Sequence, residues 1–262
     1  MRKLSVGVLK SLYAPAPHSH KGDNGSLVVV GGSERYHGAP LLAVKTASRF
    51  VDFVLFYSPA RINERVMAVM KSKTNCFIWI KRSELLNAIE ESDCVLIGNG
   101  LLVNAENKRL VNGLLKRFAK RKKMVLDAGA LRMADKRLFT KNVLVSPHPL
   151  EFEALFGVTA SVKEARKQAR KWNCLVLLKK KHCFITDGNE VWFNNNGNAG
   201  MTKGGTGDVL AGVCASLACK NNLLEAAKTA AFVNGRAGDS LRKRKGFVFN
   251  ADDLAEEVGL IV

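Results

Sequence analysis

The sequence predicts an α/β fold: a doubly wound, mostly parallel sheet with helices on both faces. Short, uninterrupted runs of Val, Ile and Leu alternate with longer segments whose apolar residues have helical spacing. Strands that helices cover on both sides need such continuous apolar runs, because neither face of the sheet meets water. No stretch rich in Pro, Gly or Ser divides the chain and no repeat is present, so residues 1–262 are expected to form a single domain.

Seven segments have the length and apolar content of strands in this sheet. They are residues 27–30, 53–56, 76–80, 94–97, 124–126, 143–145 and 175–178. After the last of these, residues 182–186 and 190–193 flank an Asp187-Gly188 turn, which predicts an antiparallel hairpin at the edge of the sheet. Two long helices are expected next, over residues 208–219 and 224–241.

The composition is that of a folded cytoplasmic protein. Hydrophobic residues make up 47% and charged residues 24% of the chain, which excludes the disordered and collagen-like classes. No apolar run approaches the roughly 20 residues that span a bilayer, and Lys10, Pro15 and Pro17 interrupt the faint likeness of the N-terminus to a signal peptide. Six scattered cysteines without a C-x-x-C spacing are expected to be buried, reduced thiols rather than zinc ligands or disulfides.

The chain is strongly basic. It carries 41 Lys and Arg against 23 Asp and Glu, a formal net charge of +18, which raises the alternative of a nucleic-acid-binding protein without catalysis. The basic residues occur in short bursts, mostly on segments with helical spacing, and no recognisable RNA module accompanies them. Solvated helix faces explain this charge, so we expect no nucleic-acid partner, although the same field would attract small polyphosphates.

The strongest chemical signal is a glycine-rich loop that runs directly into an apolar helix. The loop reads Gly197-Asn198-Ala199-Gly200-Met201-Thr202-Lys203-Gly204-Gly205-Thr206-Gly207-Asp208. Glycines let backbone N–H groups converge on an anion at the positive end of the helix, which is typical of a phosphate site. Asp208 could then act as a base on an alcohol while the amides hold the transferring phosphoryl group. The alternative is that Asp208 only caps the helix.

Further candidate residues follow the predicted strands. They are Gly31-Gly32 with Gly38-Ala39-Pro40, then Gly98-Asn99-Gly100, Asp127, and residues 146–151. In doubly wound folds, ligands bind at the carboxyl ends of the strands, so these segments are expected to meet there. Each also has a simpler interpretation. Asp127 could be a helix cap, Pro147-His148-Pro149 a rigid turn, and Glu151 a first-turn acid that interacts favourably with the helix dipole.

Taken in order, these motifs resemble the ADP- or ATP-dependent NAD(P)H-hydrate dehydratases of the ribokinase-like superfamily. The matching segments are His20-Lys21-Gly22-Asp23, Gly32-Ser33 with Tyr36 and Gly38-Ala39-Pro40, Ile97-Gly98-Asn99-Gly100-Leu101, Leu126-Asp127-Ala128, Pro147-His148-Pro149 with Glu151, Gly197-Asn198, and Gly204-Gly205-Thr206-Gly207-Asp208. The Gly-Thr-Gly-Asp part is shared with sugar and vitamin kinases. The Lys-Gly-Asp and Gly-Ser-x-x-Tyr-x-Gly-Ala-Pro parts are similar to the dehydratase branch.

The resemblance implies repair of hydrated NADH or NADPH, in which ADP or ATP phosphorylates the hydrate hydroxyl and phosphate then leaves. It implies that Asp208 is the base. The groups that would stabilise the phosphoryl are the amides of Gly205, Thr206 and Gly207. The residues that would contact the hydrate are Ala39, Gly100, His148 and Asp208. Those that would contact the nucleotide are Lys179, Lys180, Lys181, His182, Cys183 and Gly207, and Asp127, Glu151 and Asn198 are further candidates.

The same resemblance implies the accessory components. Mg²⁺ is expected to bridge the donor phosphates without a direct protein ligand, with Glu151 a helper through water. A homo-oligomer is expected. Many relatives carry an NAD(P)H-hydrate epimerase as an N-terminal domain, but only about twenty residues precede His20, so the epimerase is expected to be a separate chain.

Four features depart from the family pattern. The sequence has Lys179-Lys180-Lys181 in place of Lys-Gly, Gly129 in place of a second acid, Leu150 in place of Gly, and Asn234 in place of His. None of these positions is the expected base.

The nearest alternative is a related small-alcohol kinase of the hydroxymethylpyrimidine or hydroxyethylthiazole type, which would release a phosphorylated alcohol. Lys21-Gly22-Asp23 and Ala39-Pro40 favour the dehydratase.

Overall fold

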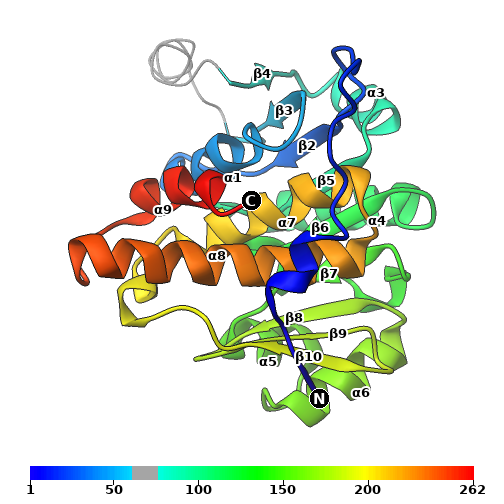
Figure 1. Ribbon diagram of the computed structural model, residues 1–262. Helices are drawn as coiled ribbons and strands as arrows, with labels where there is room; N and C mark the ends of the chain where they lie inside the picture. The colour runs from blue at the N-terminus through cyan, green and yellow to red at the C-terminus, as the bar shows by residue number, and fades with distance from the viewer. Residues whose placement is uncertain (61–75) are drawn as a thin grey trace.

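The computed structural model describes residues 1–60 and 76–262. Its centre is a ten-stranded sheet with the order β1-β10-β9-β8-β7-β6-β5-β2-β3-β4 (Figure 1). The strands are β1 (Arg2–Lys3), β2 (Ser26–Val30), β3 (Phe53–Tyr57), β4 (Ile78–Trp79), β5 (Cys94–Ile97), β6 (Lys123–Leu126), β7 (Val143–Val145), β8 (Leu175–Lys179), β9 (Cys183–Thr186) and β10 (Val191–Asn194).

Neighbouring strands in the run β8-β7-β6-β5-β2-β3-β4 all pair in parallel. Strand β9 pairs antiparallel with both β8 and β10. The hairpin predicted from the Asp187-Gly188 turn is therefore present. Its predicted place at the sheet edge is wrong, because β1 pairs in parallel with β10, with Arg2 opposite Trp192. The edge strand β1 consists of the exposed residues Arg2 and Lys3. It therefore lacks the apolar pattern from which strands are predicted.

Helices cover both faces of the sheet, as predicted. They are α1 (Gly38–Ala47), α3 (Leu85–Glu91), α4 (Ala105–Phe118), α5 (Pro149–Phe156), α6 (Val162–Trp172), α7 (Thr206–Lys220), α8 (Leu223–Lys245) and α9 (Ala251–Glu257). Short 3₁₀ turns are η1 (Val6–Leu9), η2 (Ala128–Arg132), η3 (Lys136–Leu138), η4 (Ala199–Thr202) and η5 (Val258–Leu260).

Alternate residues of each strand serve two separate hydrophobic cores. In β2, Leu27 and Val29 pack in the core that contains α1, α7, α8 and α9, while Val28 and Val30 pack in the core that contains α3, α4, α5 and α6. Figure 1 shows α7 and α8 lying across the front of the sheet. Because both faces are buried, the central strands consist mainly of continuous apolar runs, such as Leu27 to Val30 in β2, and this is the pattern that predicted the fold.

Helix α4 shows how the basic bursts are accommodated. Asn104 caps the helix by accepting a 2.8 Å hydrogen bond from the Asn107 N–H. The buried residues Leu110, Val111, Leu114, Leu115 and Phe118 repeat at helical spacing along one face. The basic side chains at the end of the helix are exposed, which agrees with the solvated helix face predicted for them.

Several predicted boundaries need correction. The strand expected over residues 76–80 contains only Ile78–Trp79, and Cys76 is an exposed thiol rather than a buried one. Helix α7 begins at Thr206, two residues before the predicted start at Asp208, because Gly205 in a left-handed conformation ends the loop. Helix α8 continues to Lys245, since basic residues are good helix formers and favour the helix C-terminus even without an apolar pattern. No helix in the two described segments combines the length and apolar character required to cross a bilayer.

Candidate active site

The carboxyl ends of adjacent parallel strands bring the candidate residues together. Their last residues pair as direct neighbours in β2, β5, β6 and β7: Val30, Ile97, Leu126 and Val145. The residues that come next are therefore side by side at one edge of the sheet: Gly31, Gly98, Asp127 and Ser146. Lys179, the last residue of β8, joins them from the next strand. The strand order thus gathers segments that lie far apart in the sequence.

Asp127 is the buried centre of this group. One carboxylate oxygen, Oδ1, accepts hydrogen bonds from Lys179 Nζ at 2.6 Å and from Ser146 Oγ at 2.8 Å. The other, Oδ2, accepts from Asn99 Nδ2 at 3.2 Å. Asp127 occupies the N-cap position of η2, but its side chain makes no capping hydrogen bond there. Asp127 instead connects three strand ends through its carboxylate.

Asp208 lies in the first turn of α7 and reaches the same network. Its Oδ1 accepts a 2.6 Å hydrogen bond from Asn99 Nδ2. The N-cap of α7 is Gly205, so Asp208 is not the cap of this helix. Burial and the nearby Asp127 carboxylate raise the pKa of Asp208 to about 7, against the opposing effects of Asn99 and Lys179. A carboxyl group that titrates near neutral pH is suited to general base catalysis.

Lys179 supplies the positive charge among these carboxylates. Its Nζ is 2.6 Å from Asp127 Oδ1 and 3.9 Å from Glu151 Oε2. Burial disfavours the charged ammonium, but Asp127 and Glu151 outweigh this effect and raise the pKa of Lys179 above its usual value. Burial raises the pKa of Glu151, with a smaller contribution from Asp127. Lys179 is therefore a charged ammonium at neutral pH.

The glycine-rich loop leads directly into this network. Gly205 has φ of +95°, and a Cβ there would lie 2.5 Å from Leu42 Cδ1 and 2.7 Å from Ala251 Cβ, so only glycine fits. Thr206 Oγ1 donates to Met201 O and Lys203 O, which holds the loop in shape. The first N–H groups of a helix have no intrahelical partner. In α7 the Thr206 N–H donates to Lys203 O at 3.4 Å, whereas those of Gly207 and Asp208 have no backbone acceptor among the described residues and can bind an anion.

A cavity of about 700 Å³ lies on one side of the first turn of α7. Its lining includes the four residues predicted for the hydrated substrate, Ala39, Gly100, His148 and Asp208, together with Glu151. His148 also caps α5: its Nδ1 accepts from the Leu150 N–H at 3.2 Å, while Glu151 Oε2 accepts from the His148 N–H at 2.9 Å. His148 Nδ1 is thus engaged as an acceptor, and Nε2 lies 3.4 Å from Glu151 Oε1. The interpretation of Glu151 as a first-turn acid is correct, and this acid also faces the cavity.

A second cavity, of about 460 Å³, lies on the other side. Its lining includes all six residues predicted for the nucleotide: Lys179, Lys180, Lys181, His182, Cys183 and Gly207. It also includes Thr206, predicted for the phosphoryl group, and the further candidate Asn198. Apolar side chains of Met201, Leu210 and Ala231 complete the wall. Gly205 lines neither cavity. The two cavities meet at α7, where Gly207 lines the smaller one and Asp208 the larger one.

The departures from the family pattern all lie on these cavities. Lys180, Lys181 and Asn234 line the smaller cavity, whereas Gly129 and Leu150 line the larger one. The sequence predicted no specific role for Asn99 or Arg132. Arg132 lines the larger cavity. The signal that could have identified Asn99 is its position in Gly98-Asn99-Gly100, directly after a predicted strand, because it alone of these three residues has a side chain.

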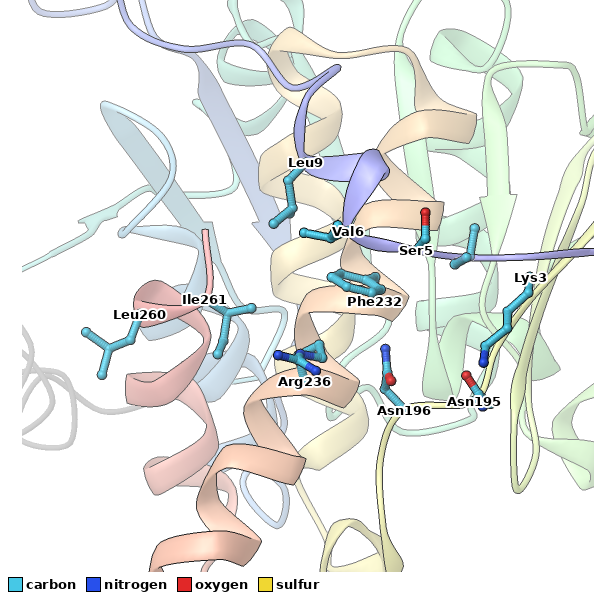
Figure 2. Close-up of a pocket in the computed structure, with 11 residues that line it drawn as sticks. Lys3, Ser5, Val6, Leu9, Asn195, Asn196, Phe232, Arg236, Leu260 and Ile261 are labelled. Carbon is cyan, nitrogen blue, oxygen red and sulfur yellow. The ribbon is translucent and has the colours of Figure 1, made fainter.

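A further cavity, of about 590 Å³, lies between the N-terminal segment, α8 and the C-terminus (Figure 2). Figure 2 shows Phe232 of α8 next to Val6, and Arg236 further along the helix toward Ile261. Asn196 lines both this cavity and the 460 Å³ cavity. None of the residues predicted for catalysis or binding lies in its wall.

A family model described as NAD(P)H-hydrate dehydratase matches residues 27–259. The chain belongs to the NAD(P)H-hydrate dehydratase family. The ADP-dependent (S)-NAD(P)H-hydrate dehydratase of Nitrosopumilus maritimus is 36% identical over 284 residues, covering 100% of this chain and 97% of that protein. The family and the ribokinase-like fold predicted from the motifs are therefore confirmed.

Longer and more distant members of the NAD(P)H-hydrate dehydratase family are also similar. The bifunctional NAD(P)H-hydrate repair enzyme Nnr of Methanocaldococcus jannaschii is 35% identical over 96% of this chain, which spans about half (51%) of that relative's length. The crystal structure of ADP/ATP-dependent NAD(P)H-hydrate dehydratase from Bacillus subtilis, co-crystallised with ATP/Mg²⁺, has a TM-score of 0.83 and 25% identity, covering 97% of this chain and 94% of that one.

Proposed function

We propose that this protein uses ADP or ATP to dehydrate hydrated NADH or NADPH. The observation that carries the proposal is the position of Asp208. Its carboxylate lines the larger cavity, while the preceding residue, Gly207, lines the smaller one. A phosphoryl donor in the smaller cavity and an alcohol in the larger one would meet at the first turn of α7. Membership of the family and the ADP dependence of the Nitrosopumilus relative support this assignment.

The first step transfers a phosphoryl group. The hydrate hydroxyl attacks the terminal phosphorus of the nucleotide, a new O–P bond forms, and the bond to AMP or ADP breaks. Asp208 accepts the hydroxyl proton, for which a pKa of about 7 is suited. Backbone N–H groups at the start of α7, together with the Lys179 ammonium, stabilise the charge that moves onto the phosphoryl oxygens.

The second step expels phosphate. The lone pair of the ring nitrogen forms a C=N bond as the C–O bond to phosphate breaks, and phosphate leaves far more readily than hydroxide. The adjacent carbon then loses a proton, which restores the ring double bond of the dihydronicotinamide. The net products are NAD(P)H, phosphate and either AMP or ADP. The restored ring absorbs light where the hydrate does not, which provides the assay.

The two cavities differ in ways that match these ligands. We assign the hydrate to Ala39, Gly100 and His148, which line the larger cavity together with Glu151. We assign the nucleotide to the smaller cavity, where Met201 and Leu210 offer apolar surface to the base and Lys179 approaches the phosphates. ADP is the first donor to test, because the relative that this chain matches over its whole length is ADP-dependent.

The described residues fit magnesium only as a companion of the nucleotide. No group of three or more His, Cys, Asp or Glu within residues 1–60 and 76–262 is arranged to hold a metal ion. Both Asp127 oxygens are already hydrogen-bonded, whereas Glu151 lines the larger cavity and could contact a metal-bound water there. Mg²⁺ usually keeps several waters and binds through substrate phosphates. When bound, it would neutralise charge on the donor phosphates.

The test is to mix the purified protein with hydrated NADH, magnesium and either ADP or ATP, and to follow the dihydronicotinamide absorbance and the released phosphate. We expect both to rise in equal amounts with one of the nucleotides. An accumulating phosphomonoester without restored absorbance would contradict the proposal and favour a small-alcohol kinase. The expected homo-oligomer and the separate epimerase stay predictions, and light scattering of the purified protein tests the first of them.

A further inference from the structure

The backbone around Asn99 gives its side chain a single direction. Asn99 follows β5, is fully buried, and its carbonyl accepts a 2.7 Å hydrogen bond from the Gly32 N–H. Gly98 has φ of +129° and Gly100 has φ of +76°. A Cβ on Gly98 would collide with the backbone of Asp127, and one on Gly100 with that of Tyr36. Asn99 is therefore the only residue of this three-residue turn that can place a side chain among the carboxylates.

The amide of Asn99 joins two carboxylates. Its Nδ2 donates to Asp208 Oδ1 at 2.6 Å and to Asp127 Oδ2 at 3.2 Å. These two bonds use both hydrogens of the NH₂ group. The Oδ1 of Asn99 is buried and has no hydrogen-bond partner, so the donor group is the part of this side chain that makes polar contacts. An unpaired buried oxygen costs free energy. In Asn99 this cost accompanies the two hydrogen bonds by which its NH₂ group bridges Asp127 and Asp208.

No other described side chain holds Asp208 in this way. The nearby ammonium of Lys179 hydrogen-bonds to Asp127 and lies next to Glu151. Among residues 1–60 and 76–262, the hydrogen bond from Asn99 is the only one from a side chain to the Asp208 carboxylate. This bond engages Oδ1. The other oxygen, Oδ2, accepts no hydrogen bond from a described side chain, and Asp208 lines the larger cavity.

We propose that Asn99 is the positioning residue of the base: its amide holds Asp208 Oδ1 against the anchored Asp127, so that Oδ2 faces the hydroxyl of the substrate. This inference rests on the proposed function. Asp127 is itself fixed by Lys179 and Ser146, so, with Asn99, the orientation of the base is set from the ends of four strands, β5, β6, β7 and β8. Without the amide, two neighbouring carboxylates would repel each other and Asp208 would turn away.

The same bond affects when Asp208 is ionised. The groups that face it are Asp127 and Glu151, which disfavour its charge, Lys179, which favours it, and His148 in the wall of the cavity. A hydrogen bond from Asn99 to the carboxylate stabilises the ionised form and lowers the pKa of Asp208. Removal of the amide is therefore expected to raise the pH at which the base becomes active.

The experiment compares Asn99→Leu, which keeps the size of the side chain but has no donor, with Asn112→Leu. Asn112 donates to the Lys108 and Met133 carbonyls and lines neither catalytic cavity, so it matches the loss of a side-chain amide away from the site. For Asn99→Leu we expect kcat to fall on the order of 100-fold and the acid limb of the pH profile to move up by about one unit. The Kd of the nucleotide should stay within about threefold, because the interaction lost acts on the base. The Asn112→Leu profile should match that of the wild type.

A second measurement reads the titration of Asp208 directly. The ¹³C carboxyl signal of Asp208, assigned by its absence in Asp208→Asn, is followed against pH without substrate, in the wild type and in Asn99→Leu, or in Asn99→Ala if the leucine variant does not fold. An unchanged midpoint together with an unchanged kcat would overturn the inference. The two proposals can fail separately. If the Asp208 midpoint is raised in Asn99→Leu but the wild-type protein does not restore the dihydronicotinamide, Asn99 still positions Asp208 and the proposed function is rejected instead.

Discussion

Gly207 and Asp208 are consecutive residues of α7 and line different cavities. Gly207 lines the 460 Å³ cavity with Lys179, and Asp208 lines the 700 Å³ cavity with His148. A single peptide unit therefore separates the proposed donor side from the proposed acceptor side. In phosphoryl transfer the attacking and leaving oxygens lie roughly in line with phosphorus between them, and this arrangement places the first turn of α7 at that point.

Substitution Asp208→Asn should abolish turnover and leave nucleotide binding intact. Asparagine fills the same space but does not accept the hydroxyl proton, so we expect kcat to fall by roughly 10²- to 10⁴-fold. The smaller cavity, which Asp208 does not line, keeps its shape. Steady-state kinetics and calorimetric titration with ADP check the two halves of this prediction. Full activity in Asp208→Asn would reject Asp208 as the base.

The rate should depend on pH through the same group. Since the pKa of Asp208 is raised to about 7, its carboxylate is protonated and inactive in mild acid, and it becomes ionised as the pH rises past 7. We expect kcat/KM to increase along a single acid limb with a midpoint near pH 7, well above the ordinary value for an aspartate. A pH profile measured with saturating nucleotide checks this. A limb centred near pH 4 would contradict it.

The raised pKa also predicts that Asp208 destabilises the folded protein at neutral and alkaline pH. The folded state binds the Asp208 proton more tightly than the unfolded state, so stability falls as the pH rises from about 4 through 7. Asp208→Asn removes this burden and should be more stable than the wild type at pH 8 by on the order of 2 kcal/mol, after allowance for partial exposure. The difference should vanish near pH 4. Urea unfolding at both pH values measures it.

Loss of the Lys179 charge should destabilise the protein. Lys179→Met leaves the buried Asp127 carboxylate without its ion-pair partner, which we expect to cost about 3 kcal/mol. Lys180→Met is the matched stability control, because Lys180 is exposed and makes no ion pair among the described residues. Denaturant unfolding of both variants checks the prediction. If Asp127→Asn in the Lys179→Met background does not recover part of the loss, the ion pair is not its cause.

Two neighbouring glycines should respond differently to alanine. Gly205→Ala forces φ of +95° on a residue with a side chain and pushes its Cβ against Leu42 and Ala251, so we expect a loss of about 1–3 kcal/mol. Gly204→Ala meets nothing within 4 Å and should change stability by less than about 0.5 kcal/mol. Thermal unfolding of the two variants provides the comparison. Equal effects would show that the conformation of Gly205 is not what requires glycine.

Much of the architecture could be predicted from local sequence. Continuous apolar runs identified the strands of β2, β5, β6, β7 and β8, because burial on both faces leaves polar residues only at their ends. Where burial is partial, the pattern failed: β1 consists of two exposed basic residues, and the exposed Cys76 precedes β4 instead of belonging to it. Boundaries at α7 and α8 also differed, because glycine conformation and helix propensity set them without changing the apolar pattern.

The sequence by itself determined the family, the glycine loop and the residue proposed as the base, because these depend on residue types at fixed spacing along the chain. Only the tertiary structure decided what those residues contact. Lys179 points to Asp127 as well as lining the predicted nucleotide site, and Asn99, between two glycines, bridges Asp127 and Asp208. The physical reason is that these residues lie 28 to 109 positions apart in sequence, at the ends of different strands and, for Asp208, in helix α7. Pairing order and register bring them together, and no local pattern records either.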